Sequence, residues 1–145
     1  MSDADEITTL VHSYARLLDG GDVDGVVALF EHSTWRSLPN GSVLRGSAEV
    51  RPVYENLFAR EGGLQTKHLI TNLSIDVEPG AVTASSHCYW TVLRSAPGEP
   101  IGITLSGQYT DRFEKFDGHW RFLDRLITTD QTSEPPQLPP SDPSG

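Results

Sequence analysis

The spacing of the apolar residues changes once along the chain, near residue 65, and this change limits the folds that the chain can adopt. Residues 5–19 carry apolar side chains at the three- and four-residue intervals of a helix with one buried face. From Gln65 onward, apolar and polar residues alternate over 65–77, 82–94, 101–116 and 119–128, as in half-buried strands. Helices followed by a run of strands predict an α+β domain, in which one strongly curved, mostly antiparallel sheet wraps around a helical layer.

Turn-forming residues divide the helical half of the chain. A glycine pair at 20–21 ends the first helix, and Asp22 or Asp24 can cap a second one. An Asn-Gly pair at 40–41 predicts a tight turn between two short strands, because such turns need positive φ angles. A third helix is expected to open at Ser47, which gives the order ααββαββββ.

The length of 145 residues predicts one domain, which we place at residues 1–129. The last segment, DQTSEPPQLPPSDPSG at 130–145, contains five prolines and almost nothing apolar. We therefore expect a disordered tail there.

The charge of the chain restricts its partners. Twenty acidic against 11 basic residues give a formal charge of −9, which opposes binding to nucleic acid or to an anionic membrane. A neutral or cationic small molecule, or a protein, is the expected partner. The start MSDADE does not resemble a signal peptide and no apolar run is long enough to cross a membrane, so a cytoplasmic location is expected.

Two residues stand out as candidates for chemistry. Asp19 falls at the negatively polarised end of the first helix, where a carboxylate is disfavoured unless a local partner compensates. His68, in the stretch KHLITN, occupies a strand position that an apolar residue would ordinarily fill. A solvated turn acid and a core histidine bonded to backbone are the alternatives. Together, however, an aspartate that binds one ring nitrogen would leave the other nitrogen free as a base.

Strand alternation also predicts the surroundings of His68. If His68 faces the pocket, Thr66, Ile70 and Asn72 share its face. The opposite face then carries Leu69, Thr71, Leu73 and Ile75. Because both faces are apolar, we expect the outer face to pack against a second subunit in a homodimer.

Several segments, namely YARLLDGGDVDGVVALF, KHLITN and GQYTDRFEKFDGHWRF, give the chain a resemblance to a known family. Over residues 5–128 it resembles the SnoaL-like branch of the nuclear-transport-factor-2-like superfamily, which includes scytalone dehydratase and hexachlorocyclohexane dehydrochlorinase. The resemblance implies a cone-shaped α+β barrel with an Asp19–His68 catalytic dyad. It also implies a pocket whose expected substrate-binding residues are Tyr14, Leu18, Trp35, Tyr54, Cys88, Trp90, Leu105, Tyr109 and Arg125.

Some features of these residues leave alternatives open. Scytalone dehydratase uses a second histidine on a late strand, whereas the matching stretch ITLSGQY has none. Arg125 could bind a substrate carboxylate or carbonyl, or could pair with an acid such as Asp111. Cys88 is expected to be a buried thiol, and the aromatic residues could equally be ordinary core.

No phosphate-binding loop, redox-cofactor motif or metal-spaced histidine cluster is found, so no cofactor or metal is assigned. The leading hypothesis is a cofactor-independent lyase or isomerase acting on an apolar or aromatic small molecule. A non-catalytic ligand-binding or accessory module is the first alternative. Epoxide hydrolysis, which would need an Asp-Arg-Asp arrangement, is the second.

Overall fold

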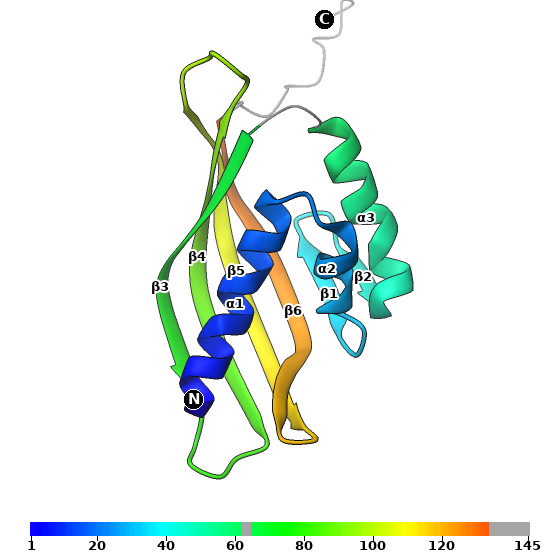
Figure 1. The fold of residues 1–145 in the computed structure, drawn as a ribbon, viewed down its shortest axis with the longest axis vertical. Helices are drawn as coiled ribbons and strands as arrows, with labels where there is room; N and C mark the ends of the chain where they lie inside the picture. The colour runs from blue at the N-terminus through cyan, green and yellow to red at the C-terminus, as the bar shows by residue number, and fades with distance from the viewer. Residues whose placement is uncertain (62–64, 134–145) are drawn as a thin grey trace, which may run out of the picture.

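The computed structural model describes residues 1–61 and 65–133, which form three helices and six strands (Figure 1). The order is the expected ααββαββββ. The elements are α1 (Asp3–Asp19), α2 (Val23–Ala28), β1 (Thr34–Leu38), β2 (Ser42–Arg45), α3 (Gly46–Arg60), β3 (Gln65–Asp76), β4 (Thr83–Ser95), β5 (Gly102–Phe116) and β6 (His119–Thr132).

The six strands form one strongly curved sheet in the order β2-β1-β6-β5-β4-β3. Four long strands, β3 to β6, form an antiparallel meander, and α1 lies across it, with α2 and α3 beside β1 and β2 (Figure 1). The expected cone-shaped α+β architecture is therefore confirmed, although among the described residues the sheet stays open between β2 and β3. One pairing, β1 with β6, is parallel.

The helix boundaries follow the local signals. Asp22 caps α2 by accepting a hydrogen bond of 2.9 Å from the backbone N–H of Gly25. Gly21 has a φ angle of +69°, which lets the chain reverse between α1 and α2. The third helix begins at Gly46 and not at Ser47, because the Glu49 side chain reaches back to the backbone N–H of Arg45.

The core lies between α1, α3 and the concave face of the sheet. It is rich in aromatic residues, and Phe30, Phe113 and Phe122 are almost fully buried within it. The rings of Phe113 and Phe122 lie 5.0 Å apart, and those of Phe30 and Phe122 lie 5.5 Å apart. This packing fixes α1 and α2 over the sheet and so sets the position of the last turn of α1.

The second half of β3 corrects one expectation. The register of β3 against β4 shifts between Thr71 and Ser74, and Asn72 takes a left-handed φ of 54°. This β-bulge reverses the alternation, so Asn72 is exposed while Leu73 and Ile75 pack against the core. The expectation that Leu73 and Ile75 face outward was therefore wrong, and Leu69 remains as the apolar residue of the outer face of β3, 42% exposed.

The C-terminal end of the domain also differs from the expected boundary at residue 129. β6 continues to Thr132, so residues 130–132 belong to the sheet although a disordered tail was expected from residue 130. The rest of that expected tail, from residue 134 on, lies outside the described residues. Within the part of the chain that the structure describes, no helix is long and apolar enough to cross a membrane.

Candidate functional site

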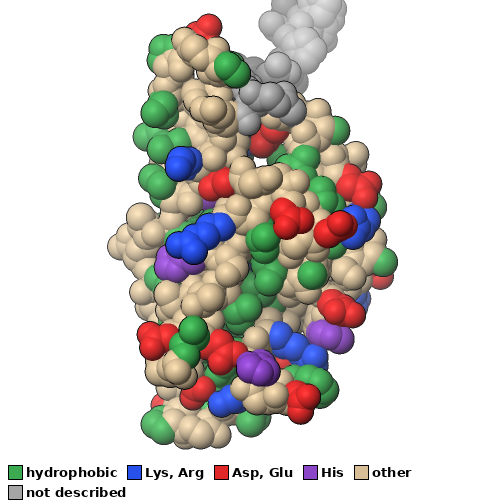
Figure 2. All heavy atoms as spheres, in the orientation of Figure 1, with side chains coloured by type: hydrophobic (Ala, Val, Ile, Leu, Met, Phe, Trp, Pro, Cys, Tyr) green, Lys and Arg blue, Asp and Glu red, His purple; other side chains and the backbone are tan. Residues whose placement is uncertain are grey.

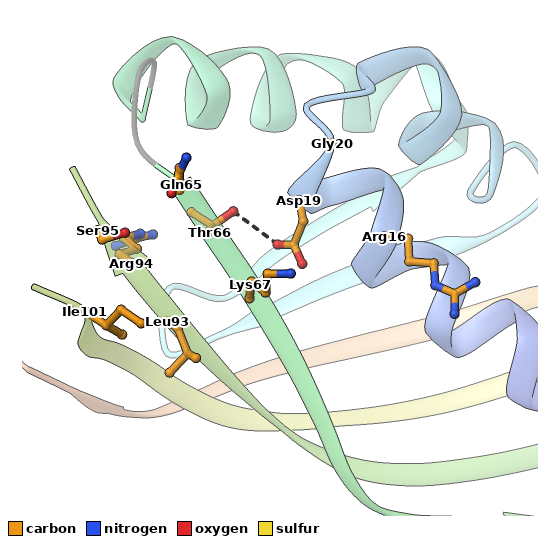
Figure 3. A pocket seen from close by; sticks show the side chains of 10 residues that line it. All are labelled: Arg16, Asp19, Gly20, Gln65, Thr66, Lys67, Leu93, Arg94, Ser95 and Ile101. Atoms are coloured by element: carbon orange, nitrogen blue, oxygen red, sulfur yellow. Dashed lines mark hydrogen bonds between the residues drawn. The ribbon is translucent and has the colours of Figure 1, made fainter. Parts of the chain in front are cut away.

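Asp19 and His68 meet at the junction between the last turn of α1 and the edge of the sheet. β3 is an edge strand, so alternate backbone N–H groups point away from β4 and are free to bind another element. α1 ends at Asp19 beside this edge, and the Asp19 side chain points toward β3 (Figure 3). The position of the carboxylate therefore depends on how α1 packs across the sheet.

Three donors from β3 bind the Asp19 carboxylate. The ring Nδ1 of His68 lies 2.5 Å from Oδ1, and the backbone N–H of His68 donates to Oδ2 at 2.9 Å. The hydroxyl of Thr66 donates to Oδ1 at 3.1 Å, as Figure 3 shows. These donors compensate the unfavourable position of a carboxylate at the C-terminal end of a helix. They also hold it in one orientation.

The His68 ring is largely enclosed, with a side chain 11% exposed, against 23% for Asp19. Because a carboxylate accepts hydrogen bonds, the contact between Asp19 and Nδ1 favours the tautomer in which Nδ1 carries the proton and Nε2 a lone pair. No hydrogen bond joins Nε2 to another described residue. The arrangement can therefore accept a proton at Nε2 and stabilise the resulting imidazolium through the carboxylate.

A cleft of about 670 Å³ opens beside this pair (Figure 3). Asp19 and Thr66 line it, whereas the His68 ring is not among its described lining residues. The remaining lining residues come from α1, β3, β4 and the segment after β4: Arg16, Gly20, Gln65, Lys67, Leu93, Arg94, Ser95 and Ile101.

The expected aromatic residues of the pocket form a hydroxyl network in the interior. The hydroxyls of Tyr14 and Tyr54 lie 2.7 Å apart, and the indole N–H of Trp35 donates to Tyr54 at 3.0 Å. All three residues are at most 5% exposed, and burial raises the pKa of both tyrosines. The structure brings these residues together, but they do not line the cleft beside Asp19.

Trp90 and Tyr109 continue this interior on the sheet. Their rings stack at 5.8 Å, and the Trp90 indole N–H has no acceptor among the described residues. Cys88 is fully buried beside them, and burial raises the pKa of its thiol to about 11. Leu18 is buried on α1 and Leu105 is partly buried on β5.

Arg125 pairs with Asp111, which is the second of the two alternatives expected for it. Its guanidinium donates two hydrogen bonds of 2.8 Å to Asp111, which is directly opposite on β5, and both side chains are fully buried. The guanidinium carbon also lies 4.0 Å from the ring centre of Tyr109 and 4.4 Å from that of Tyr14. Burial by itself would lower the pKa of Arg125, and the adjacent Asp111 more than offsets this effect, which raises the pKa above its ordinary value.

The sequence reasoning missed three basic residues of the cleft. Arg94 has the same phase as Trp90 on β4, so alternation alone could have placed it on the inner face. Arg16 is on the exposed side of α1, and Lys67 faces opposite to His68. Nothing in the local sequence of these two residues indicated that they line one cleft.

Comparisons with known proteins agree with this architecture. A protein of unknown function with a cystatin-like fold from Nostoc punctiforme superposes with a TM-score of 0.75 at 24% identity, over 98% of this chain and 95% of that one. ActVI-ORFA from Streptomyces coelicolor superposes with a TM-score of 0.74 at 23% identity, over 89% of this chain and 98% of that one.

A third structure, from Novosphingobium aromaticivorans and provisionally named a scytalone dehydratase, superposes with a TM-score of 0.73 at 26% identity. The superposition covers 90% of this chain and 86% of that one. No curated protein sequence matches the chain. The model of the SnoaL-like domain, which has the nuclear-transport-factor-2-like fold, matches residues 1–125, and the chain therefore belongs to the SnoaL-like family.

Proposed function

We propose that this protein is a cofactor-independent lyase or isomerase in which His68 abstracts a proton from a small organic substrate. The observation that supports it is the 2.5 Å contact between Asp19 Oδ1 and His68 Nδ1, on a carboxylate that two further donors hold in place. The name of the similar protein from Novosphingobium aromaticivorans agrees with a dehydratase reaction.

In the proposed reaction, the lone pair on Nε2 of His68 takes a proton from carbon beside a carbonyl group. The electron pair of the broken C–H bond then forms a double bond. In a lyase it expels a leaving group from the next carbon, such as hydroxide, which leaves as water after protonation. In an isomerase the proton returns from Nε2 to a different carbon. Asp19 is the positioning residue, because it holds Nδ1–H and stabilises the imidazolium.

A deuterium-exchange assay tests the proton abstraction before the natural substrate is identified. Aromatic ketones with a β-hydroxyl group are incubated with the protein in D₂O, and loss of the α-proton signal is followed by NMR. Catalysed exchange should fall about 10²- to 10⁴-fold in His68→Gln, which is the usual contribution of a general base. His87→Gln is the matched control, because His87 bonds to Gln108 and not to Asp19. Exchange that is equally fast in wild type and His68→Gln would contradict the proposal.

A non-catalytic binding module is the second candidate. The observation that favours it is that the cleft reaches Asp19 and Thr66 but not the His68 ring, while the interior aromatic residues pack against one another. Under this reading a ligand bound to the purified protein returns chemically unchanged after long incubation. Conversion of that ligand, lost in His68→Gln, would exclude it.

Epoxide hydrolysis has less support. Such a site needs an arginine between two carboxylates around a water molecule, to which Asp19 and Arg125 could contribute. Asp19 instead binds His68 and Thr66, and Arg125 binds Asp111. The Nη1 group of Arg125 has no acceptor among the described residues.

We also propose that the protein forms a homodimer through the outer face of its sheet. Two apolar side chains on neighbouring strands are exposed there, Leu69 at 42% and Tyr89 at 47%, and Ile103 on β5 is 63% exposed. Sedimentation equilibrium should give twice the chain mass of 15.9 kDa, and Tyr89→Lys should shift the protein toward monomer. A wild-type protein that sediments as a monomer at micromolar concentration would refute the dimer.

A further inference from the structure

The charges around the cleft beside Asp19 are opposite to those of the whole chain. The protein carries 20 acidic and 11 basic residues, yet the described residues that line the cleft include three cations, Arg16, Lys67 and Arg94, and one carboxylate, Asp19. In Figure 3, β3 lies between Arg16 and Asp19 of α1 on one side and Arg94 of β4 on the other. Figure 2 shows basic side chains over α1 and the adjoining sheet edge.

These cations are incompletely neutralised by the protein. Arg16 and Lys67 have no acidic side chain within ion-pair distance in the described part of the chain. Arg94 pairs through Nη2 with Glu61, yet its buried Nε–H has no acceptor among the described residues. A buried N–H without a partner costs free energy, and an oxygen atom of a ligand in the cleft would satisfy it.

The charge count indicates what kind of anion fits. In the described part of the chain, three cations line the cleft, and two carboxylates lie at it or beside it, namely Asp19 and the Glu61 that pairs with Arg94, which leaves one net positive charge. This matches a monoanion. A phosphate dianion would exceed this charge and would lie close to the Asp19 carboxylate. Arginine is suited to planar carboxylates, and Leu93 and Ile101 offer apolar contact to the rest of such a molecule.

We propose that this cleft selects organic substrates that carry one carboxylate group, held by Arg94 and attracted by Lys67 and Arg16. The inference rests on the proposed function, since it names the substrate class for the cleft beside the Asp19–His68 pair, which reaches Asp19 of that pair. It also revises the expectation from net charge, because the local field at the cleft favours an anion although the chain as a whole is acidic.

Binding of 2-naphthoate and of its neutral analogue 2-naphthamide, measured by calorimetry at low salt, tests this selectivity. The acid should bind wild-type protein at least tenfold more tightly than the amide, and added salt should reduce the difference because two of the three cations are exposed. The double variant Arg94→Gln/Glu61→Gln keeps the net charge of the cleft but removes the guanidinium. It should lose most of the preference for the acid.

Two matched variants complete the experiment. Arg121→Gln removes a positive charge that pairs with Glu114 away from the cleft, and it should keep the preference within about twofold. His68→Gln should still bind naphthoate, because the inference assigns carboxylate binding to the cations of the cleft. The catalytic proposal is tested separately, by the deuterium-exchange assay. Equal affinity for acid and amide, no saturable binding of naphthoate, or an undiminished preference in the Arg94/Glu61 double variant would overturn the inference.

Discussion

The buried ion pair between Arg125 and Asp111 makes the most quantitative prediction about this fold. Both side chains are fully buried and are joined by two hydrogen bonds of 2.8 Å. Removing one partner of such a pair strands a charge in the interior, which typically costs about 3–5 kcal/mol. In Asp111→Asn one acceptor oxygen remains, and the Tyr14 and Tyr109 rings still face the guanidinium. We therefore expect a loss near the lower limit, about 3 kcal/mol.

Urea denaturation of wild type and Asp111→Asn measures this loss, with equal slopes confirming that both unfold in the same way. Replacing both partners, as in Asp111→Leu/Arg125→Met, should cost clearly less than the single change, because no buried charge is left unpaired. A partly exposed pair is the control: Asp124→Asn, which removes the charge that faces the 42%-exposed Arg36, should cost less than about 1 kcal/mol. If Asp111→Asn is within 1 kcal/mol of wild type, the account of this interior is wrong.

Three further predictions concern stability. Gly107→Ala should destabilise the protein by about 2 kcal/mol or more in urea denaturation, because the added Cβ would lie 1.9 Å from a β6 backbone oxygen and 2.6 Å from the Trp90 ring. Gly102→Ala is the control and should be nearly neutral, because no atom lies within 4 Å of the added Cβ. Stability should fall as pH rises from 9 to 11, by about 2 kcal/mol from Cys88 alone, because the thiol ionises at lower pH in the unfolded chain than in the folded one; Cys88→Ala should weaken this dependence. Asn72→Val should cost about 1–2 kcal/mol and Asn72→Gly little, as a left-handed φ of 54° requires; equal losses would contradict the bulge.

The sequence predicted the features that depend on local patterns. The change of apolar spacing near residue 65 gave the three helices and the meander, and the Asn-Gly pair at 40–41 gave the hairpin between β1 and β2. The proximity of Asp19 and His68 was also predicted, from an unfavourable charge at a helix end, an unusual strand residue and the family resemblance. The helix-end charge, the strand histidine and the turn residues can each be recognised from a few neighbouring residues of the sequence.

Features that depend on register and on long-range contact were not predictable in the same way. The bulge at Asn72 reversed the facing of Leu73 and Ile75, since one extra residue shifts every side chain beyond it. Whether Arg125 lies opposite Asp111 depends on the β5–β6 register, which itself contains shifts. The parallel pairing of β1 with β6 joins segments about ninety residues apart and has no local signal.

The cleft illustrates the same limit. Its lining comes from the end of α1, the start of β3 and the end of β4, which are far apart in sequence. Net charge averages over the chain and therefore pointed to a neutral or cationic ligand. Only the assembled fold places Arg16, Lys67 and Arg94 around one space.

The central claim is that Asp19 holds one proton on Nδ1 of His68 and leaves Nε2 free to act as a base. A long-range ¹H–¹⁵N NMR spectrum of uniformly labelled protein, with His68→Gln used to assign the ring, reads the tautomer directly. The claim predicts that the neutral ring carries its proton on Nδ1, and that Asp19→Asn shifts it toward Nε2, because the amide can donate to Nδ1. A neutral His68 ring protonated on Nε2 in the wild-type protein would contradict it.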